Sequence, residues 1–210
     1  MTHKSIRHNP YKIVQMFEEE VAEYTGAPFA VSVDSCTNAL FLACKYYKVR
    51  EVTIPKRTYL SVPMSIMHAG GEVVFEDRDW KGIYQLKPYP IYDSAKRFTS
   101  DMYIPGTAMC LSFHIKKLLS VGKGGMILTD NYKMVEWLKK ARYEGRGEVN
   151  YKDDSIETLG WNMYMTPQQA AHGLAMFQNY PEHMSDLGED NGYRDLTEFT
   201  VFKNNKTIEK

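Results

Sequence analysis

The sequence predicts an α/β protein with three layers, in which a mostly parallel sheet is flanked by helices on both faces. Short apolar runs of strand length alternate along the chain with longer stretches whose apolar residues recur at helical spacing. This alternation is typical of parallel sheets that are covered by helices. Polar residues follow several of the apolar runs, at the positions where such sheets bind their ligands.

The first expected element is a helix over residues 11–24. Phe17 and Val21 fall on its apolar stripe, and Gly26 can end it in a left-handed conformation. Further helices are expected around Leu40 and Cys44 and over residues 58–68, 132–143 and 167–177. Strands are expected over residues 29–33, 52–54, 73–75, 90–92, 108–113 and 124–129. Residues 181–210 are polar and weakly periodic, which predicts a tail, an arm or a fragment of a second domain.

The composition argues against several functional classes. Basic and acidic residues balance at 26 each, so no overall charge attracts nucleic acid or an anionic membrane. The apolar runs are too short to cross a bilayer, and the N-terminal residues lack the apolar stretch of a secretory signal. Cys36, Cys44 and Cys110 are too scattered for a disulfide framework or a zinc site, and no metal site is expected. These features predict a cytoplasmic protein.

Four groups of polar residues follow expected strands, at residues 34–38, 58–59, 93–96 and 112–117. The first group leads into a helix, whose N-terminal N–H groups and dipole favour a phosphate. Ser35 would serve equally well as an ordinary helix cap, so this group alone decides nothing.

Asp93 and Lys117 are the two charged residues with the strongest chemical interest. A carboxylate directly after an apolar strand needs a cationic or donor partner, which could be a protonated pyridine nitrogen or a structural salt bridge to Lys96 or Arg97. A partly desolvated lysine at residue 117 would have a lowered pKa and could attack an aldehyde. Taken singly, such a lysine is more often a solvated surface charge.

Several other titratable residues are interpreted as structural. His68, His172 and His183 lack the spacing of metal ligands. Arg142 belongs to a basic run that follows the helix expected over residues 132–143. We interpret this run as a solvated loop rather than a diphosphate site.

Residues 112–125 read SFHIKKLLSVGKGG, which resembles the signature around the cofactor lysine of the DegT/DnrJ/StrS-type sugar aminotransferases. That signature has Ser-Phe-His, two residues, a lysine and a glycine-rich loop, and its register selects Lys117 rather than Lys116. The family depends on pyridoxal 5′-phosphate (PLP) and has the fold type I architecture. The resemblance therefore implies the large domain of that fold, with Lys117 as the residue that binds PLP covalently.

Four further segments resemble the same family, in the same order along the chain. They read DSCTNALFLA, IPKRTYLS, PIYDSAK and GWNMYMTPQQAAHGLA. The resemblance implies that PLP contacts the turn at residues 35–37, the ring of Tyr59 and the carboxylate of Asp93. It also implies that further residues bind the phosphate of PLP or lie beside its phenolic oxygen. The full set is Ser35, Cys36, Thr37, Tyr59, Asp93, Lys96, Ser112, Lys117 and Asn162.

The resemblance also implies how these residues divide the work. Lys117 would transfer the proton between substrate and cofactor, Asp93 would keep the pyridine nitrogen protonated, and Tyr59 would stack on the ring. Asn162 would reach the phosphate bound by a second subunit, which implies a homodimer with shared active sites. Glutamate would donate the amino group, and a keto group on a nucleotide-linked sugar would accept it.

The sequence also departs from the family pattern. Cys36 stands in place of a glycine in the phosphate turn, where a side chain can crowd the phosphate or strain the backbone. Lys96 replaces a glutamine or histidine. The interval between residues 79 and 93 is too short for the helix and strand that the family has there. We therefore expect a shortened member, with a PLP-binding large domain at 1–180 and a remnant of the small domain or a tail at 181–210.

Three functions are compatible with these features. The joint presence of Lys117, Asp93, Tyr59 and Asn162 favours an aminotransferase. A catalytically inactive binding or scaffold protein on the same fold is the main alternative. A PLP-dependent sugar dehydratase is the other, but that branch of the family replaces the lysine with histidine, and Lys117 argues against it.

Overall fold

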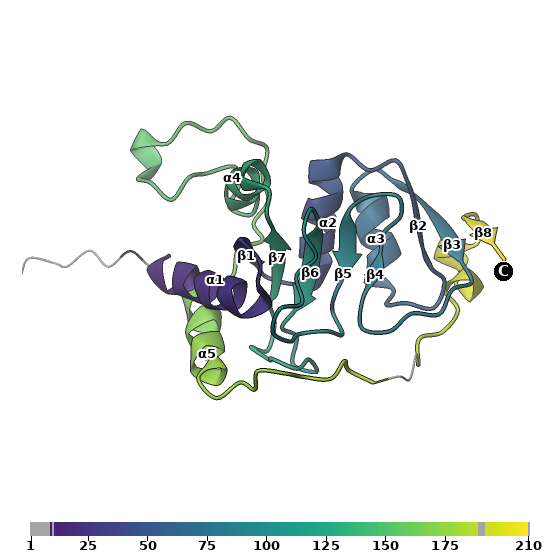
Figure 1. Ribbon diagram of the computed structural model, residues 1–210. Coiled ribbons are helices and arrows are strands. Elements are labelled where there is room, and N and C mark those ends of the chain that lie inside the picture. Colours follow the sequence, from purple (N-terminus) through teal and green to yellow (C-terminus); the bar gives the residue numbers. More distant parts are fainter. Residues whose placement is uncertain (1–8, 10, 189–191, 210) are drawn as a thin grey trace, which may run out of the picture.

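The computed structural model describes residues 9, 11–188 and 192–209 (Figure 1). Its helices are α1 (Lys12–Thr25), α2 (Cys36–Tyr47), α3 (Ser61–His68), α4 (Tyr132–Ala141) and α5 (Pro167–Phe177), with short 3-10 turns η1 (Tyr151–Asp153), η2 (Leu196–Glu198) and η3 (Thr200–Phe202). Its strands are β1 (Phe29–Val33), β2 (Glu51–Pro55), β3 (Glu72–Glu76), β4 (Tyr84–Gln85), β5 (Ile91–Asp93), β6 (Ala108–Ser112), β7 (Gly125–Thr129) and β8 (Lys206–Ile208). Within this part of the chain, no helix has the length and apolar character needed to cross a membrane.

The strands form two hydrogen-bonded groups that a single bridge joins. The first group has the order β1-β7-β6-β5-β4, and the second has the order β2-β3-β8. Thr53 and Lys87 connect them through two backbone hydrogen bonds of 2.8 and 3.1 Å. Tracing the pairings shows that, among the described strands, β1, β2, β3, β5, β6 and β8 run in one direction and β4 and β7 run in the other. The prediction of a mostly parallel sheet is confirmed.

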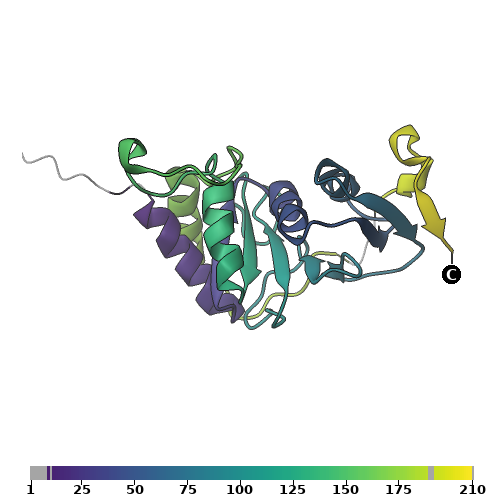
Figure 2. The ribbon, with the colours of Figure 1, turned by 90° about the horizontal axis from the view of Figure 1, so that it is seen from above.

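Side chains alternate between two apolar cores on the two faces of the sheet. Along β6, Cys110 faces α2, whereas Met109 and Leu111 face α1 and α5. Strands β1 and β7 alternate in the same way, as expected for strands that are covered on both sides. Figure 2 shows α1 and α5 packed side by side, away from α2, α3 and β8. The expected three layers are therefore present.

Local sequence signals account for most of the element boundaries. Gly26 ends α1 with a φ of 72°, in the left-handed region that favours glycine. Thr166 and Gln169 form a capping box at the start of α5, and Pro167 occupies its first turn. The helix expected over residues 58–68 begins only at Ser61, because the residues before it form a loop at the end of β2.

The segment between residues 79 and 93 contains β4, which the sequence did not predict. No helix lies in this interval, all of which is described. Strand β4 pairs antiparallel with β5, with Tyr84 opposite Asp93. Because β4 is only two residues long, its sequence carries no detectable alternation of apolar and polar residues.

Residues 192–209 form an arm that lies beside the ends of β2 and β3 (Figure 1). Strand β8 pairs with β3, so the arm extends the edge of the sheet. Leu196 and Phe202 insert into the core on the α2 and α3 side, with exposed fractions of 2% and 1%. These two contacts were not predicted, because two apolar residues in a polar stretch do not make a periodic pattern.

A buried ion pair joins α1, β1 and the end of α4. The Arg142 guanidinium donates to the carboxylate of Glu18 and, at 2.6 Å, to the backbone oxygen of Ser32. Glu18 also accepts the Ser32 N–H at 2.8 Å. Arg142 and Glu18 are only 3% and 5% exposed. The interpretation of Arg142 as part of a solvated loop is therefore wrong, because its partners lie on elements far away in the sequence.

Replacing Arg142 with methionine should lower the free energy of unfolding by about 3–5 kcal/mol, because the Glu18 carboxylate would stay buried without its cation. Urea denaturation of the whole chain measures this loss. Lys206→Met is the matched control, since it breaks the exposed pair with Glu51 and should hardly move the denaturation midpoint. Equal losses in the two variants would contradict the structural role of the buried pair.

Candidate functional site

The polar residues that were predicted at strand ends meet at one edge of the sheet. Strands β1, β2, β5 and β6 run in the same direction, so their carboxyl ends lie at the same edge. Such an edge is where α/β sheets bind ligands. A cavity of about 390 Å³ lies there, a size in the range of small-molecule sites. It is lined by Ser35, Cys36, Thr37, Tyr59, Asp93, Lys96, Ser112 and Lys117, together with residues that the sequence did not single out.

One end of the cavity is the N-terminus of α2. Ser35 caps this helix, and its hydroxyl accepts the N–H of Asn38 at 3.2 Å. The start of β7 packs directly against this turn: a Cβ atom on Gly125 would lie 2.4 Å from the carbonyl carbon of Ser35. Only glycine allows this approach. The first backbone N–H groups of α2 have no partner within the helix and border the cavity, so this end suits an anion.

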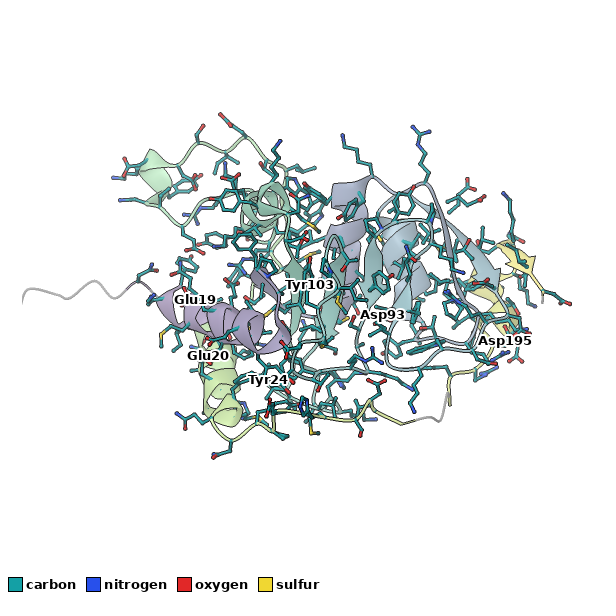
Figure 3. The ribbon with its side chains drawn as sticks, in the orientation of Figure 1. Glu19, Glu20, Tyr24, Asp93, Tyr103 and Asp195 are labelled. Atoms are coloured by element: carbon teal, nitrogen blue, oxygen red, sulfur yellow. The ribbon has the colours of Figure 1, made fainter. Side chains whose placement is uncertain are left out.

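Asp93 carries the buried charge of the site. It ends β5, is only 5% exposed, and lies near the middle of the molecule (Figure 3). Its Oδ1 accepts the N–H of Ala95 at 2.9 Å, and its Oδ2 accepts the hydroxyl of Tyr84 at 2.9 Å. Burial raises the pKa of the Asp93 carboxyl, and these two hydrogen bonds and the nearby lysines Lys117 and Lys96 oppose that rise.

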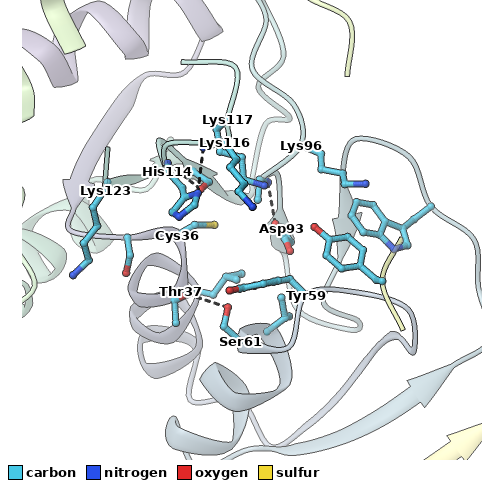
Figure 4. A pocket seen from close by; sticks show the side chains of 18 residues that line it. Cys36, Thr37, Tyr59, Ser61, Asp93, Lys96, His114, Lys116, Lys117 and Lys123 are labelled. Carbon is cyan, nitrogen blue, oxygen red and sulfur yellow. Dashed lines mark hydrogen bonds between the residues drawn. The ribbon is translucent and has the colours of Figure 1, made fainter. Parts of the chain in front are cut away.

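Lys117 and Tyr59 reach into the cavity from opposite sides in Figure 4, with Asp93 between them. Lys117 follows β6 in a tight loop, where its N–H donates to the oxygen of His114 at 2.8 Å. The loop is closed by the N–H of Ile115, which donates to the oxygen of Gly122 at 2.9 Å. The glycine-rich sequence therefore folds back on itself and directs the lysine toward the sheet edge. Lys116 lines the same cavity.

Cys36 takes its place in the site without the backbone strain that the sequence suggested, and Lys96 lies near two aromatic rings. Cys36 is the first residue of α2 and is not among the described residues with positive φ, so its side chain does not strain the backbone. Its thiol donates to the oxygen of Cys110 at 3.5 Å, and burial raises the pKa of this thiol well above its ordinary value. The ammonium of Lys96 lies 5.3 Å from the ring centre of Trp80 and 5.0 Å from that of Tyr193.

Trp80, Tyr84 and Tyr193 belong to the site but were missed in the sequence. Trp80 and Tyr193 line the cavity, and their rings stack at 6.1 Å. Trp80 is held by a hydrogen bond from its indole N–H to the oxygen of Arg57 at 2.8 Å. The sequence has 15 tyrosines and three tryptophans, and these counts do not point to particular positions.

Tyr193 reaches the cavity because ion pairs fasten the arm to the end of β2. The Lys56 ammonium lies 3.1 Å from Asp77 and 3.0 Å from Asp195. Figure 3 shows Asp195 on the side of the molecule where β8 lies. Hydrogen bonds from Lys56 and then Arg57 hold the pKa of Asp77 below its ordinary value. The stability that this adds is complete above the carboxyl's unfolded pKa and is lost as the pH falls through the folded one.

Asn162 is the one predicted site residue that does not line the cavity. It lies after the loop that follows α4, where its side-chain amide donates to Glu144 and its backbone bridges to Tyr143. Ser112 does line the cavity, and its hydroxyl accepts the N–H of His114 at 3.4 Å. The structure thus brings together every predicted site residue except Asn162.

The family model of the DegT/DnrJ/EryC1/StrS aminotransferases matches residues 2–100 and 104–188. The match covers well over half of the sequence. The chain belongs to this family. The resemblance that rested on the SFHIKK stretch and its companion segments is therefore confirmed, and so is the expected fold class.

Curated relatives of known name are longer than this chain. The spore coat polysaccharide biosynthesis protein SpsC of Bacillus subtilis is 28% identical over 218 residues, which cover 77% of this chain and 55% of the relative. A GDP-perosamine synthase of Caulobacter vibrioides is 24% identical over 219 residues, which cover 83% of this chain and 58% of the relative. The chain thus spans a little over half the length of these two relatives.

Solved structures of the same fold also match. A DegT/DnrJ/EryC1/StrS aminotransferase from Brucella abortus superposes with a TM-score of 0.74 at 16% identity, covering 94% of this chain and 80% of the other. The aminotransferase PseC of Helicobacter pylori superposes with a TM-score of 0.68 at 16% identity, covering 81% of this chain and 58% of the other. At these identities, the similarity establishes the fold.

Replacing Asp195 with asparagine should loosen the arm, because the variant keeps an oxygen to cap η2 but loses the charge that pairs with Lys56. Hydrogen exchange of the Leu196 N–H, which donates to the oxygen of Lys56 at 2.9 Å, should become roughly two- to fivefold faster. Glu198→Gln is the control, since it breaks the exposed pair with Arg194 on the same arm. Unchanged exchange in Asp195→Asn would show that the ion pairs do not hold the arm.

Proposed function

We propose that this protein binds PLP in the cavity at the sheet edge and transfers an amino group from glutamate to a keto group of a nucleotide-linked sugar. The observation that carries the proposal is that Asp93, at the end of β5, and Lys117, in the loop after the neighbouring β6, line one cavity together with the N-terminal residues of α2. Membership of an aminotransferase family agrees with it.

The residues present fit PLP by their chemistry. PLP has an aldehyde, a basic ring nitrogen and a phosphate, and each of these needs a different partner. The cavity offers a primary amine at Lys117, a buried carboxylate at Asp93 and backbone N–H groups at residues 36 and 37. The exposed ring of Tyr59 lies on the wall of the cavity, where it can stack on a planar ligand.

PLP, when bound, supplies the electron sink that makes the proton on the substrate carbon removable. The residues of the chain would bind the cofactor and transfer the protons. Lys117 would bind the cofactor's aldehyde and later move a proton with its Nζ atom. Asp93 would hold the proton on the ring nitrogen, because an ionised carboxylate favours a cation beside it. The first turn of α2, with Ser112, would bind the phosphate, and Lys96 would lie beside the cofactor's phenolic oxygen.

The relatives support the substrate class. Two relatives are GDP-perosamine synthases, and a third is a UDP-4-amino-4,6-dideoxy-N-acetyl-beta-L-altrosamine transaminase from Campylobacter jejuni. These names refer to amino sugars linked to nucleotides. We extend that chemistry to this chain as part of the proposal, together with glutamate as the donor and the cytoplasm as its location.

We further propose a homodimer in which Asn162 binds the phosphate in the partner's cavity. Asn162 lies outside the cavity of its own chain, so a role in PLP binding requires a second copy. Within each subunit, we assign residues 1–180 to the PLP-binding domain. Residues 181–210 are assigned to a remnant of the small domain or a tail, and Tyr193 and β8 lie in that part of the sequence.

Adding PLP to the purified protein should produce the visible absorption band of lysine-bound PLP. Lys117→Ala should abolish the band, because no other amine is expected to occupy the position of the reacting Nζ. Lys116→Ala is the matched control, since Lys116 is adjacent and lines the same cavity. It should keep the band.

Adding glutamate to the PLP-loaded protein should bleach the band, since the amino group moves to the cofactor in the first half of the reaction. A band that persists with glutamate would refute the proposed donor. If saturating PLP gave no band in the unaltered protein, the chain would be a binding or scaffold protein that keeps the fold without its chemistry.

A further inference from the structure

Tyr84 is a buried residue in contact with Asp93 that neither the sequence motifs nor the family resemblance assigned. It lies on β4, directly opposite Asp93 in the antiparallel pairing with β5, and is 4% exposed. Its hydroxyl is 2.9 Å from Oδ2 of Asp93 and 2.6 Å from the hydroxyl of Thr58. Thr58, at the end of β2, is itself 2% exposed. A hydrogen-bonded chain of three side chains thus runs from the loop after β2 through β4 to β5.

The direction of these hydrogen bonds follows from the groups involved. An ionised carboxylate only accepts, so the Tyr84 hydroxyl donates its single proton to Asp93. Burial and then the charge of Asp93 raise the pKa of the Tyr84 hydroxyl well above its ordinary value, so the hydroxyl keeps that proton. The Thr58 hydroxyl must therefore donate to the oxygen of Tyr84. Each bond in the chain strengthens the next one in a low-dielectric interior.

Each carboxylate oxygen of Asp93 accepts a hydrogen bond from the protein. Oδ1 accepts the Ala95 N–H, and Oδ2 accepts the Tyr84 hydroxyl. The other titratable groups that act on this carboxylate come from α2, β6, the loop after β5, the loop after β6 and the arm. They are Cys36, Cys110, Lys96, Lys117 and Tyr193. The two lysines favour the ionised carboxylate, and the buried thiols and phenols carry no charge at neutral pH.

We propose that Tyr84 is a positioning residue for Asp93: its hydroxyl keeps the buried carboxylate ionised and fixes its orientation toward the cavity. The inference rests on the proposed function only for its consequence, which is that Asp93 can then hold a proton on the ring nitrogen of PLP. The hydrogen bond itself is a property of this chain without any ligand. It also gives β4 a role, since this two-residue strand is what places a phenol beside the carboxylate.

The test is a carbon-13 NMR titration of the Asp93 carboxyl in the full chain without PLP. Tyr84→Phe should raise the pKa of Asp93 by about one to two pH units, or roughly 10- to 100-fold in the protonation equilibrium, because a hydrogen bond to a charged group is lost. Thr58→Val removes only the outer donor and should produce a smaller rise. An unchanged or lower pKa in folded Tyr84→Phe would overturn the proposal.

Tyr92→Phe is the matched control. Tyr92 precedes Asp93 on β5, but its side chain packs on the other face of the sheet, against the core of α1 and α5. Loss of its hydroxyl should leave the pKa of Asp93 unchanged. If Tyr84→Phe does not fold, Thr58→Val decides alone: a raised pKa supports the chain of hydrogen bonds, and an unchanged one contradicts it.

The outcome is separate from that of the proposed function. A raised Asp93 pKa in Tyr84→Phe, with no PLP band in the unaltered protein, would retain the positioning role and refute cofactor binding. A PLP band without any change in the Asp93 pKa would retain the proposed function and refute the role of Tyr84. If both hold, PLP affinity should also fall in Tyr84→Phe as the pH is lowered through the raised pKa of Asp93, and this loss should begin at higher pH than in the unaltered protein.

Discussion

A carboxylate buried at the end of β5 is the constraint around which the site is organised. Leaving Asp93 ionised inside the sheet costs several kcal/mol unless donors and cations surround it. The chain supplies them from separate elements: a backbone N–H from the following turn, a phenol from β4, and two lysines from the loops after β5 and β6. The N–H and Lys96 follow Asp93 directly in the sequence, whereas the phenol and Lys117 reach it only because β4 and β6 lie on either side of β5.

At the same edge of the sheet, the start of β7 packs very closely against the turn before α2. Gly125 lets β7 begin against the turn that opens α2, and no larger residue fits there. That contact places the N-terminal N–H groups of α2 in the same cavity as Lys117 and Asp93. An anion site and a carboxylate in one cavity suit a ligand with a phosphate and a basic nitrogen. The motifs that resemble the family thus come together as an anion site and a carboxylate in one cavity.

The C-terminal arm and the segment between β3 and β5 contribute aromatic residues to the site. Trp80, Tyr84 and Tyr193 come from these two segments, and the ion pairs of Lys56 hold the arm against the end of β2. Aromatic rings then enclose the Lys96 ammonium. Part of the cavity wall thus comes from residues that lie outside the sequence motifs from which the site was predicted.

The sequence alone determined the fold class, the main elements and most of the site. Apolar periodicity located β1, β6, β7 and α1, because this signal lies within a few consecutive residues. The SFHIKK stretch is equally local, and it predicted Lys117, which lines the cavity. Only the tertiary structure decided the roles of Tyr84, Tyr193 and Arg142. Their partners are Asp93, the ring of Trp80 and Glu18, and each pairing depends on how strands and helices pack rather than on local sequence. A polar residue far from its partner in sequence carries no periodic signal, so its burial and its hydrogen bonds become visible only once the sheet is assembled.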